Sequence, residues 1–173
     1  MFYNSAKVGF SKQAVINHSL RVLDYHKFYY QGPGLALGDT TFIEVLSAHF
    51  AASNQTNATA QAEAMMDYLN ALGRPGNFII MGDLNQSTSN GGPMQEMLAH
   101  PNLDIRMRDP LNISGSYTNS NHDYTWSQST RQNGQDCGAG GGLDDRFDII
   151  LFSNSILNNT DDISYVTGSH WVP

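Results

Sequence analysis

Two polar side chains stand two residues apart just after an apolar run, where a strand would deliver them to a loop. The run covers residues 78–81, and Asp83 and Asn85 follow it beyond Gly82. In an extended backbone, side chains two positions apart leave the same face. A carboxylate and a carboxamide could then hold a hard divalent cation and a phosphate oxygen, or activate water by taking its proton. The same spacing is equally typical of an Asx turn that caps a strand.

A further carboxylate, Asp148, lies inside the apolar run 146–152. Strand alternation places four side chains of this run on one face: Arg146, Asp148, Ile150 and Phe152. A carboxylate among such neighbours is costly to bury alone, so Asp148 needs a partner. Either Arg146 or a histidine from another loop would serve. A simple ion pair with Arg146 would leave Asp148 with a purely structural role.

A histidine, His49, follows the strand-like run 41–48. It ends a strand as Asp83 does, so both residues could open on the same edge of a sheet. A histidine there could donate to phosphate or shuttle a proton near neutral pH, although a lone histidine is more often a hydrogen-bonded core or rim residue. Four other histidines have no spacing that suggests a metal site: His18, His26, His100 and His122. The glycine run 138–142 lacks the Lys-Ser/Thr ending of a phosphate-binding loop.

Strands and helices must position these residues. Aromatic and β-branched content predicts strands at residues 2–10, 27–30, 41–48, 77–81, 124–127, 146–152 and 163–166. The first three of these strands follow one another with a turn at 32–34, which predicts antiparallel neighbours. Apolar residues at three- and four-residue spacing predict a helix over 57–72, with Gly73 as its C-terminal cap. A short helix is expected from Pro93, because proline favours the first turn.

Length and composition indicate one globular domain over residues 1–173. Hydrophobic residues make up 40% and charged residues 14%, which is enough apolar material for a buried core. No apolar run approaches the ~20 residues that cross a bilayer. The net charge of −7 argues against a broad basic groove for nucleic acid, although a bound metal ion can supply local positive charge. The single Cys137 cannot form an internal disulfide.

The opening residues carry no signal-peptide pattern. A secreted or extracytoplasmic bacterial location would therefore need a signal sequence outside these residues, and we leave the location open. We expect a monomer.

Three segments resemble, in order, one protein family. Residues 47–50 (Ser-Ala-His-Phe), 81–85 (Met-Gly-Asp-Leu-Asn) and 145–151 (Asp-Arg-Phe-Asp-Ile-Ile-Leu) are similar to motifs of the endonuclease/exonuclease/phosphatase superfamily, the deoxyribonuclease I-like proteins. The resemblance implies a four-layer α/β sandwich, in which two mixed sheets pack face to face and helices flank them. It also implies hydrolysis of a phosphate ester by in-line attack of water, with Mg²⁺ or a similar ion (Mn²⁺ or Ca²⁺) stabilising the developing charge.

The resemblance assigns a role to each candidate residue. Asp83 would orient or deprotonate the water and bind the metal, and Asn85 would contact the metal-bound phosphate. His49 would contact the phosphate, and Asp148 would orient a catalytic histidine near the C-terminus. The substrate would be a phosphodiester, with DNA as one candidate.

The sequence also departs from the family pattern. The metal-binding Glu of the family's first third has no counterpart here, and Gly168-Ser169-His170 lacks the aspartate of the closing Ser-Asp-His motif. Either His170 is the catalytic histidine of a degenerate motif, or the chain ends before the true one, which is the reading we favour. We therefore expect weak or no activity from the isolated 173 residues.

These departures leave other functions open. The family fold could serve as a catalytically impaired binding or accessory domain, and a lipid or inositol phosphate phosphodiesterase would share the same core. The leading interpretation is a metal-dependent phosphodiester hydrolase of endonuclease type.

Overall fold

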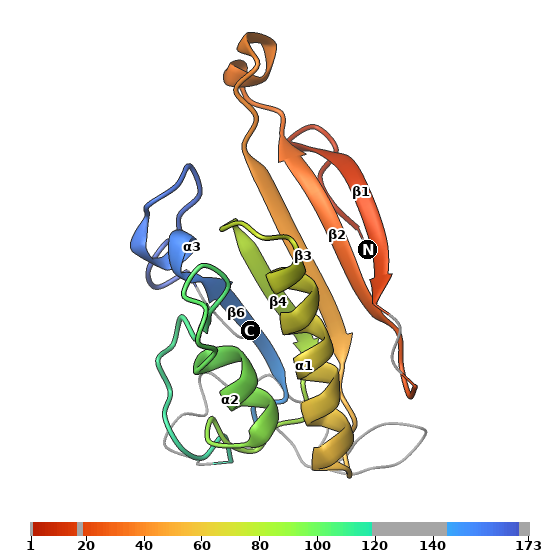
Figure 1. Ribbon diagram of the computed structural model, residues 1–173. Helices are drawn as coiled ribbons and strands as arrows, with labels where there is room; N and C mark the ends of the chain where they lie inside the picture. Colours follow the sequence, from red (N-terminus) through yellow and green to blue (C-terminus); the bar gives the residue numbers. More distant parts are fainter. Residues whose placement is uncertain (1, 17–18, 119–144, 170–173) are drawn as a thin grey trace, which may run out of the picture.

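The computed structural model of the protein describes residues 2–16, 19–118 and 145–169. They form one mixed sheet with helices packed on one of its faces (Figure 1). Six strands lie in the order β1 (Val8–Ile16), β2 (Leu23–Tyr30), β3 (Phe42–His49), β4 (Phe78–Asp83), β6 (Asp148–Ser153) and β5 (Met107–Arg108). Strands β3 and β4 are parallel and every other neighbouring pair is antiparallel. The predicted antiparallel pairing of the first three strands is confirmed.

The parallel pair requires a crossover, and the helix α1 (Gln55–Ala71) provides it. Its first turn is capped by Asn54, whose side-chain oxygen accepts a hydrogen bond from the Asn57 amide at 3.0 Å. Gly73, at φ 64°, follows the last turn. The helix predicted over 57–72 is therefore confirmed, as is the short helix expected from Pro93, which is α2 (Gly92–Leu98). Two shorter helical segments complete the described chain, η1 (Pro33–Leu37) and α3 (Asn154–Asn158).

The hydrophobic core lies between the sheet and α1 and α2. One cross-strand row on this face consists of fully or almost fully buried residues: Tyr25, Leu46, Ile80 and Leu151. The ring of Tyr25 contacts Tyr68 of α1, with 4.9 Å between ring centroids. Helical spacing places Met65, Met66 and Leu69 against the same face, and all three are buried. Burial of this face holds the sheet and the crossover together.

The opposite face of the sheet is also apolar but less covered. Alternation along the strands brings Ile79, Met81 and Ile150 to it; Ile79 and Met81 are half-buried, and Ile150 remains 38% exposed. The α/β class with a mixed sheet and flanking helices is confirmed. Of the expected four layers, the described residues contribute one sheet and the helices on one side of it.

Several predicted boundaries are wrong, each for a local reason. The first strand begins at Val8 rather than at residue 2, because a turn precedes it in which Lys7 and Val8 donate to the Asn4 carbonyl. It then continues through exposed polar residues, because pairing with β2 outweighs their low strand propensity. The turn expected at 32–34 overlaps η1, which begins at Pro33 with Gly32 as its N-terminal cap. Residues 124–127 and 138–142, predicted as a strand and a loop, lie outside the described residues.

The two predictions near the C-terminus also need correction. The strand expected at 146–152 begins only at Asp148, and Arg146 and Phe147 lie before it. Residues 163–166 are not a strand: the Tyr165 amide donates to the Ile156 carbonyl, and its ring packs against Phe152 at 5.4 Å. Among the described helices, none has the length and apolarity needed to span a bilayer.

Candidate active site

Three candidate residues form one row across three adjacent strands. His49 is paired with Asp83 in the parallel β3–β4 ladder, and Asp83 is paired with Asp148 in the antiparallel β4–β6 ladder. Alternation places the row on the face of the sheet away from α1. The row lies where β3 and β4 end, at the bottom of Figure 1. The expectation that His49 and Asp83 open on the same edge of the sheet is confirmed by this register.

The side chains of His49 and Asp83 face each other. The imidazole Nε2 lies 3.4 Å from the Asp83 carboxylate Oδ2, and the two side chains are 57% and 37% exposed. Both groups can therefore reach each other and a ligand in solvent. The backbone carbonyl of His49 also accepts a hydrogen bond from the Arg21 guanidinium at 3.2 Å.

The close approach of the two strands depends on Gly82. Its φ is 139°, a conformation that side-chain-bearing residues rarely adopt, and a Cβ built on it would lie 2.0 Å from the Ala48 carbonyl oxygen. Since Ala48 and Gly82 are paired in the ladder directly before His49 and Asp83, the glycine lets the side chains of these two candidate residues meet.

The turn after β4 is an Asx turn. The Asp83 Oδ1 accepts a hydrogen bond from the Asn85 amide at 3.0 Å, so the structural alternative named for this pair is present. Asn85 has φ 49°, and the assumption of an extended backbone through this residue is wrong, because asparagine tolerates the left-handed region. Its side-chain amide instead donates to the Phe50 carbonyl at 2.9 Å. One carboxylate oxygen of Asp83 thus fixes the turn while the other faces His49.

The carboxylate of Asp148 lies opposite a second carboxylate, that of Asp83, in the β4–β6 ladder. The pKa of Asp148 is raised above its ordinary value, first by partial burial of the carboxyl group and then by the negative charge of Asp83, while His49 acts in the opposite direction. The proposed ion pair with Arg146 is wrong. Arg146 lies before the strand begins, so alternation does not carry its side chain to the face of Asp148.

Arg146 instead binds Asp109, a residue that sequence reasoning missed. Both guanidinium NH₂ groups donate to the Asp109 carboxylate, at 2.6 and 2.9 Å, and the two side chains are only 1% and 5% exposed. Asp109 precedes a proline, which in the sequence indicates no more than a turn. Nothing in the spacing connects it to Arg146.

The row could supply part of a metal site. Carboxylate and amide oxygens such as those of Asp83, Asp148 and Asn85 suit a hard cation. Within residues 2–16, 19–118 and 145–169, no three His, Cys, Asp or Glu side chains cluster closely enough to hold a metal ion. Magnesium commonly takes one or two carboxylates and keeps several waters, so the donor set fits a partial magnesium site. His170 lies outside the described residues.

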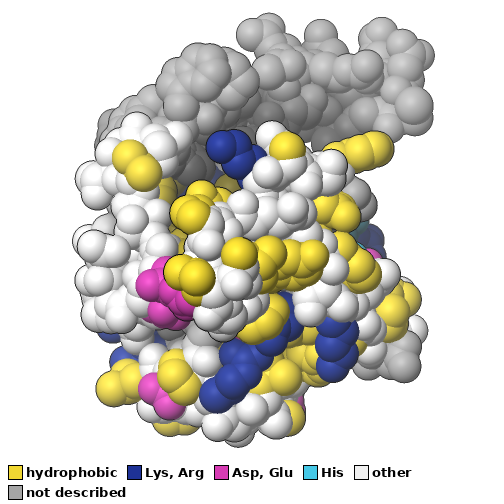
Figure 2. All heavy atoms as spheres, turned by 90° about the horizontal axis from the view of Figure 1, so that it is seen from above, with side chains coloured by type: hydrophobic (Ala, Val, Ile, Leu, Met, Phe, Trp, Pro, Cys, Tyr) yellow, Lys and Arg dark blue, Asp and Glu magenta, His cyan; other side chains and the backbone are white. Residues whose placement is uncertain are grey.

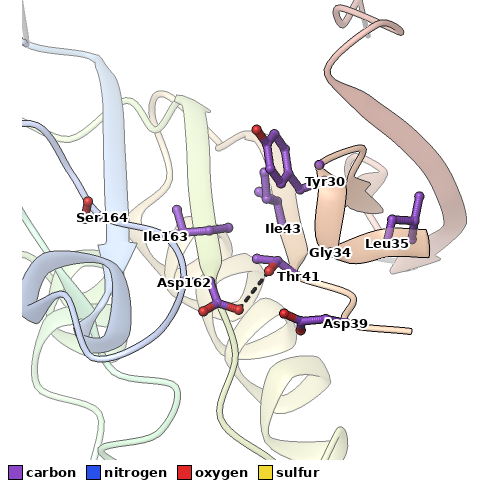
Figure 3. A pocket seen from close by; sticks show the side chains of 10 residues that line it. Tyr30, Gly34, Leu35, Asp39, Thr41, Ile43, Asp162, Ile163 and Ser164 are labelled. Atoms are coloured by element: carbon purple, nitrogen blue, oxygen red, sulfur yellow. Dashed lines mark hydrogen bonds between the residues drawn. The ribbon is translucent and has the colours of Figure 1, made fainter. Parts of the chain in front are cut away.

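A pocket among the described residues lies elsewhere. It has a volume of about 420 Å³ and is lined by Tyr30, Gly32, Gly34, Leu35, Asp39, Thr41, Ile43, Asp162, Ile163 and Ser164 (Figure 3). Thr41 donates to Asp162 across it at 2.8 Å. Since β3 begins beside this pocket and ends at His49, pocket and row occupy opposite ends of the strand. Figure 2 shows the end of the sheet that holds the pocket. In the part of the chain that the structure describes, its basic side chains lie in separate groups among hydrophobic ones and form no continuous basic surface.

Comparisons with known proteins identify the fold. No protein-family model and no curated protein matches the sequence. Solved structures do match. An endonuclease/exonuclease/phosphatase family protein from Bacteroides thetaiotaomicron has a TM-score of 0.58 and 12% identity, over 88% of this chain and 54% of its own. A mannosyl-6-phosphatase from the same organism has a TM-score of 0.59 and 12% identity, over 88% and 55%.

A third match is D. rerio TDP2 in complex with a single-stranded DNA product. Its TM-score is 0.54 and its identity 16%, over 86% of this chain and 54% of its own. Identities this low establish the fold alone, which is that of the deoxyribonuclease I-like endonuclease/exonuclease/phosphatase proteins. The chain spans about half the length of these structures.

Proposed function

We propose that the protein is a divalent-metal-dependent phosphodiester hydrolase of endonuclease type. The observation that carries the proposal is the row of His49, Asp83 and Asp148, set across three strands of a sheet whose fold occurs in phosphoesterases. Two carboxylates and a histidine at one sheet edge can transfer a proton and bind a phosphoryl group at the same place. We propose a phosphodiester as the substrate class; the matched structures include both a mannosyl-6-phosphatase and a protein in complex with a DNA product.

Each residue has a role consistent with its contacts. The Asp83 side chain is 37% exposed and its Oδ2 faces His49, so this carboxylate can orient a water and take its proton as the water attacks phosphorus. The side chain of His49 is more exposed than that of Asp83, and its ring can donate to a phosphoryl oxygen. Asn85 uses one N–H on the Phe50 carbonyl and retains a second for a phosphate oxygen. As the phosphorus–oxygen ester bond breaks, the leaving oxygen takes up a proton from solvent water, and Asp83 afterwards returns to solvent the proton that it took from the attacking water.

A divalent cation bound beside Asp83 and Asn85 would stabilise the charge that develops on the phosphoryl oxygens. The two neighbouring carboxylates of Asp83 and Asp148 make this end of the strands negative, which favours a cation; the pKa of Asp148 is raised first by its partial burial and then by the charge of Asp83. In this proposal Asp148 orients the catalytic histidine, and His170 is one candidate for it.

The test is hydrolysis of plasmid DNA and of bis-p-nitrophenyl phosphate by the complete gene product with Mg²⁺ or Mn²⁺. We expect Asp83→Asn to lower turnover by at least about 100-fold, the usual contribution of a general base. The matched control is Asp162→Asn, which removes a carboxylate at the opposite end of the sheet, where it accepts a hydrogen bond from the Thr41 hydroxyl. If the unaltered protein hydrolyses neither substrate, or if the two variants behave alike, the proposal is wrong.

One observation favours a second candidate, a binding or accessory domain without catalysis. The described residues hold no cluster of three metal-ligating side chains of the His, Cys, Asp and Glu types. Calorimetry of the complete gene product decides between the two. Heat of Mg²⁺ or Mn²⁺ binding that disappears in Asp83→Asn supports the enzyme, whereas a folded protein with no affinity for either ion supports the accessory domain.

A further inference from the structure

A buried arginine fork lies directly before the strand that carries Asp148. The guanidinium of Arg146 forms a bidentate pair with Asp109 that is almost completely shielded from solvent. The carboxylate of Asp109 is itself fixed, because it also accepts from the amides of Leu111 and Ile113, at 3.0 and 3.3 Å. Each carboxylate oxygen of Asp109 therefore accepts one hydrogen bond from a backbone amide and one from the Arg146 guanidinium.

The same fork is attached to the backbone around the candidate active site. The Arg146 amide donates to the Tyr117 carbonyl at 3.1 Å, and the Tyr117 amide donates to the Ser87 carbonyl at 2.8 Å. The Tyr117 ring lies under the guanidinium, 5.2 Å from its central carbon. The next residue, Phe147, accepts from the Leu84 amide at 2.8 Å. Arg146 thus joins the segment before β6 to the loop that follows Asp83.

The hydrogen bonds of Arg146 and Phe147 lie next to the end of the β4–β6 ladder at which Asp83 and Asp148 are paired. Asp83 and Asp148 form the last pair of the β4–β6 ladder, and like charges directly opposite each other destabilise a strand pair. Ladder ends also open more readily than ladder centres. Repulsion at the last pair would open the ladder at the very residues that the proposed reaction uses, unless the chain beyond them is held.

Stability alone does not explain such a pair. Buried ion pairs are often no more stabilising than apolar residues of the same volume. This one also leaves the Arg146 Nε buried, with no hydrogen-bond partner in the described structure, as it does the Tyr117 hydroxyl. What a bidentate fork provides is a fixed direction between two chain segments.

We propose that the Arg146–Asp109 pair is a positioning device that holds Asp148 opposite Asp83 and His49, so that Arg146 and Asp109 act on the reaction without touching the substrate. This inference rests on the proposed hydrolase function. It assigns the ion pair a role in turnover rather than in substrate binding, because Asp148 reaches the reaction through its neighbours in the row.

The chain offers a matched control beside the other end of β4. Glu44 is 1% exposed and binds the Arg74 guanidinium at 2.8 Å. Glu44 is paired with Phe78, the first residue of β4, whereas Asp83 is the last. Arg74 itself is 40% exposed, so Arg74→Met cuts a half-buried ion pair whose carboxylate lies inside the same sheet, far from the row. Arg146→Met and the milder Arg146→Lys, which keeps the charge but not the fork, test the device.

The experiment measures kcat, KM and melting temperature of the complete gene product. We expect Arg146→Met to lower kcat about 100-fold, as a misplacement of about 1 Å can do, with KM changed less than about threefold. Arg146→Lys should lower kcat about 10-fold, and it carries the test if Arg146→Met does not fold. Arg74→Met should keep kcat within about twofold despite a lower melting temperature. A normal kcat in the Arg146 variants, or an equal loss in Arg74→Met, overturns the proposal.

A spectroscopic measurement separates this inference from the proposed function. The ring signals of His49, selectively labelled with ¹⁵N, report the carboxylates beside it whether or not the protein hydrolyses anything. We expect them to shift in Arg146→Lys and to stay unchanged in Arg74→Met. If the unaltered protein proves inactive but these signals shift, positioning stands and the hydrolase proposal fails. Unchanged signals in Arg146→Lys overturn positioning.

Discussion

Replacing Gly82 by alanine should disrupt both the sheet and the candidate active site. The new Cβ would lie 2.0 Å from the Ala48 carbonyl oxygen, far inside the 3.4 Å at which ordinary contacts begin. The obstacle is backbone of the neighbouring strand, so β3 and β4 must separate by about 1 Å. Overpacking and the strained φ of 139° together cost about 4 kcal/mol. For a domain of this size, that lowers the melting temperature by about 8–16 °C.

The same separation moves His49 away from Asp83, so the folded fraction should lose activity about 100-fold. The control is Gly73→Ala, at φ 64° with nothing within 4 Å of the added Cβ. Its strain alone should cost about 1 kcal/mol, or about 2–4 °C. Thermal unfolding and hydrolysis of bis-p-nitrophenyl phosphate measure both variants. If Gly82→Ala melts within a few degrees of Gly73→Ala and keeps its turnover, the strand contact does not limit this site.

Three further outcomes are expected. Asn54→Ala removes the cap on the Asn57 amide and should cost about 1 kcal/mol in chemical unfolding without changing KM. Burial raises the pKa of Tyr117 to about 12, with the charge of Asp109 adding to it; the unfolded phenol ionises near pH 10, so stability should be intact below pH 10 and fall by about 2–3 kcal/mol as pH rises to 12. Tyr117→Phe should lose that decline in pH-dependent unfolding, and an unchanged alkaline profile would contradict the assignment. Chelation with EDTA should abolish hydrolysis and Mg²⁺ should restore it, whereas turnover that survives EDTA would exclude the metal-dependent proposal.

Much of the helical layer could be read from periodicity. Apolar spacing located α1 to within two residues at each end, because burial of Met65, Met66 and Leu69 and the turn at Gly73 are local properties of the chain. The meeting of His49 and Asp83 followed from both residues ending strands, and the parallel register of β3 and β4 delivers it.

What the sequence did not reveal depends on partners far along the chain. The pairing of Arg146 with Asp109 has no periodic signal, because it joins a loop to a residue two positions before a strand. Residues 163–166 have strand-like composition but no ladder partner among the described strands, and packing of Tyr165 on Phe152 replaces it. Asn85 was expected to be extended, yet a local hydrogen bond to Asp83 turns the chain there.

The parallel pairing of β3 and β4 also bears on the order in which the protein folds. Helix α1 lies between these strands and can form early from local contacts, since its cap and its buried stripe are contained within one short segment. The row needs three strands that are distant in sequence, and its last member joins only when β6 adds to β4. Closing such long loops is slow. Recovery of hydrolysis during refolding should therefore lag behind recovery of helical circular dichroism.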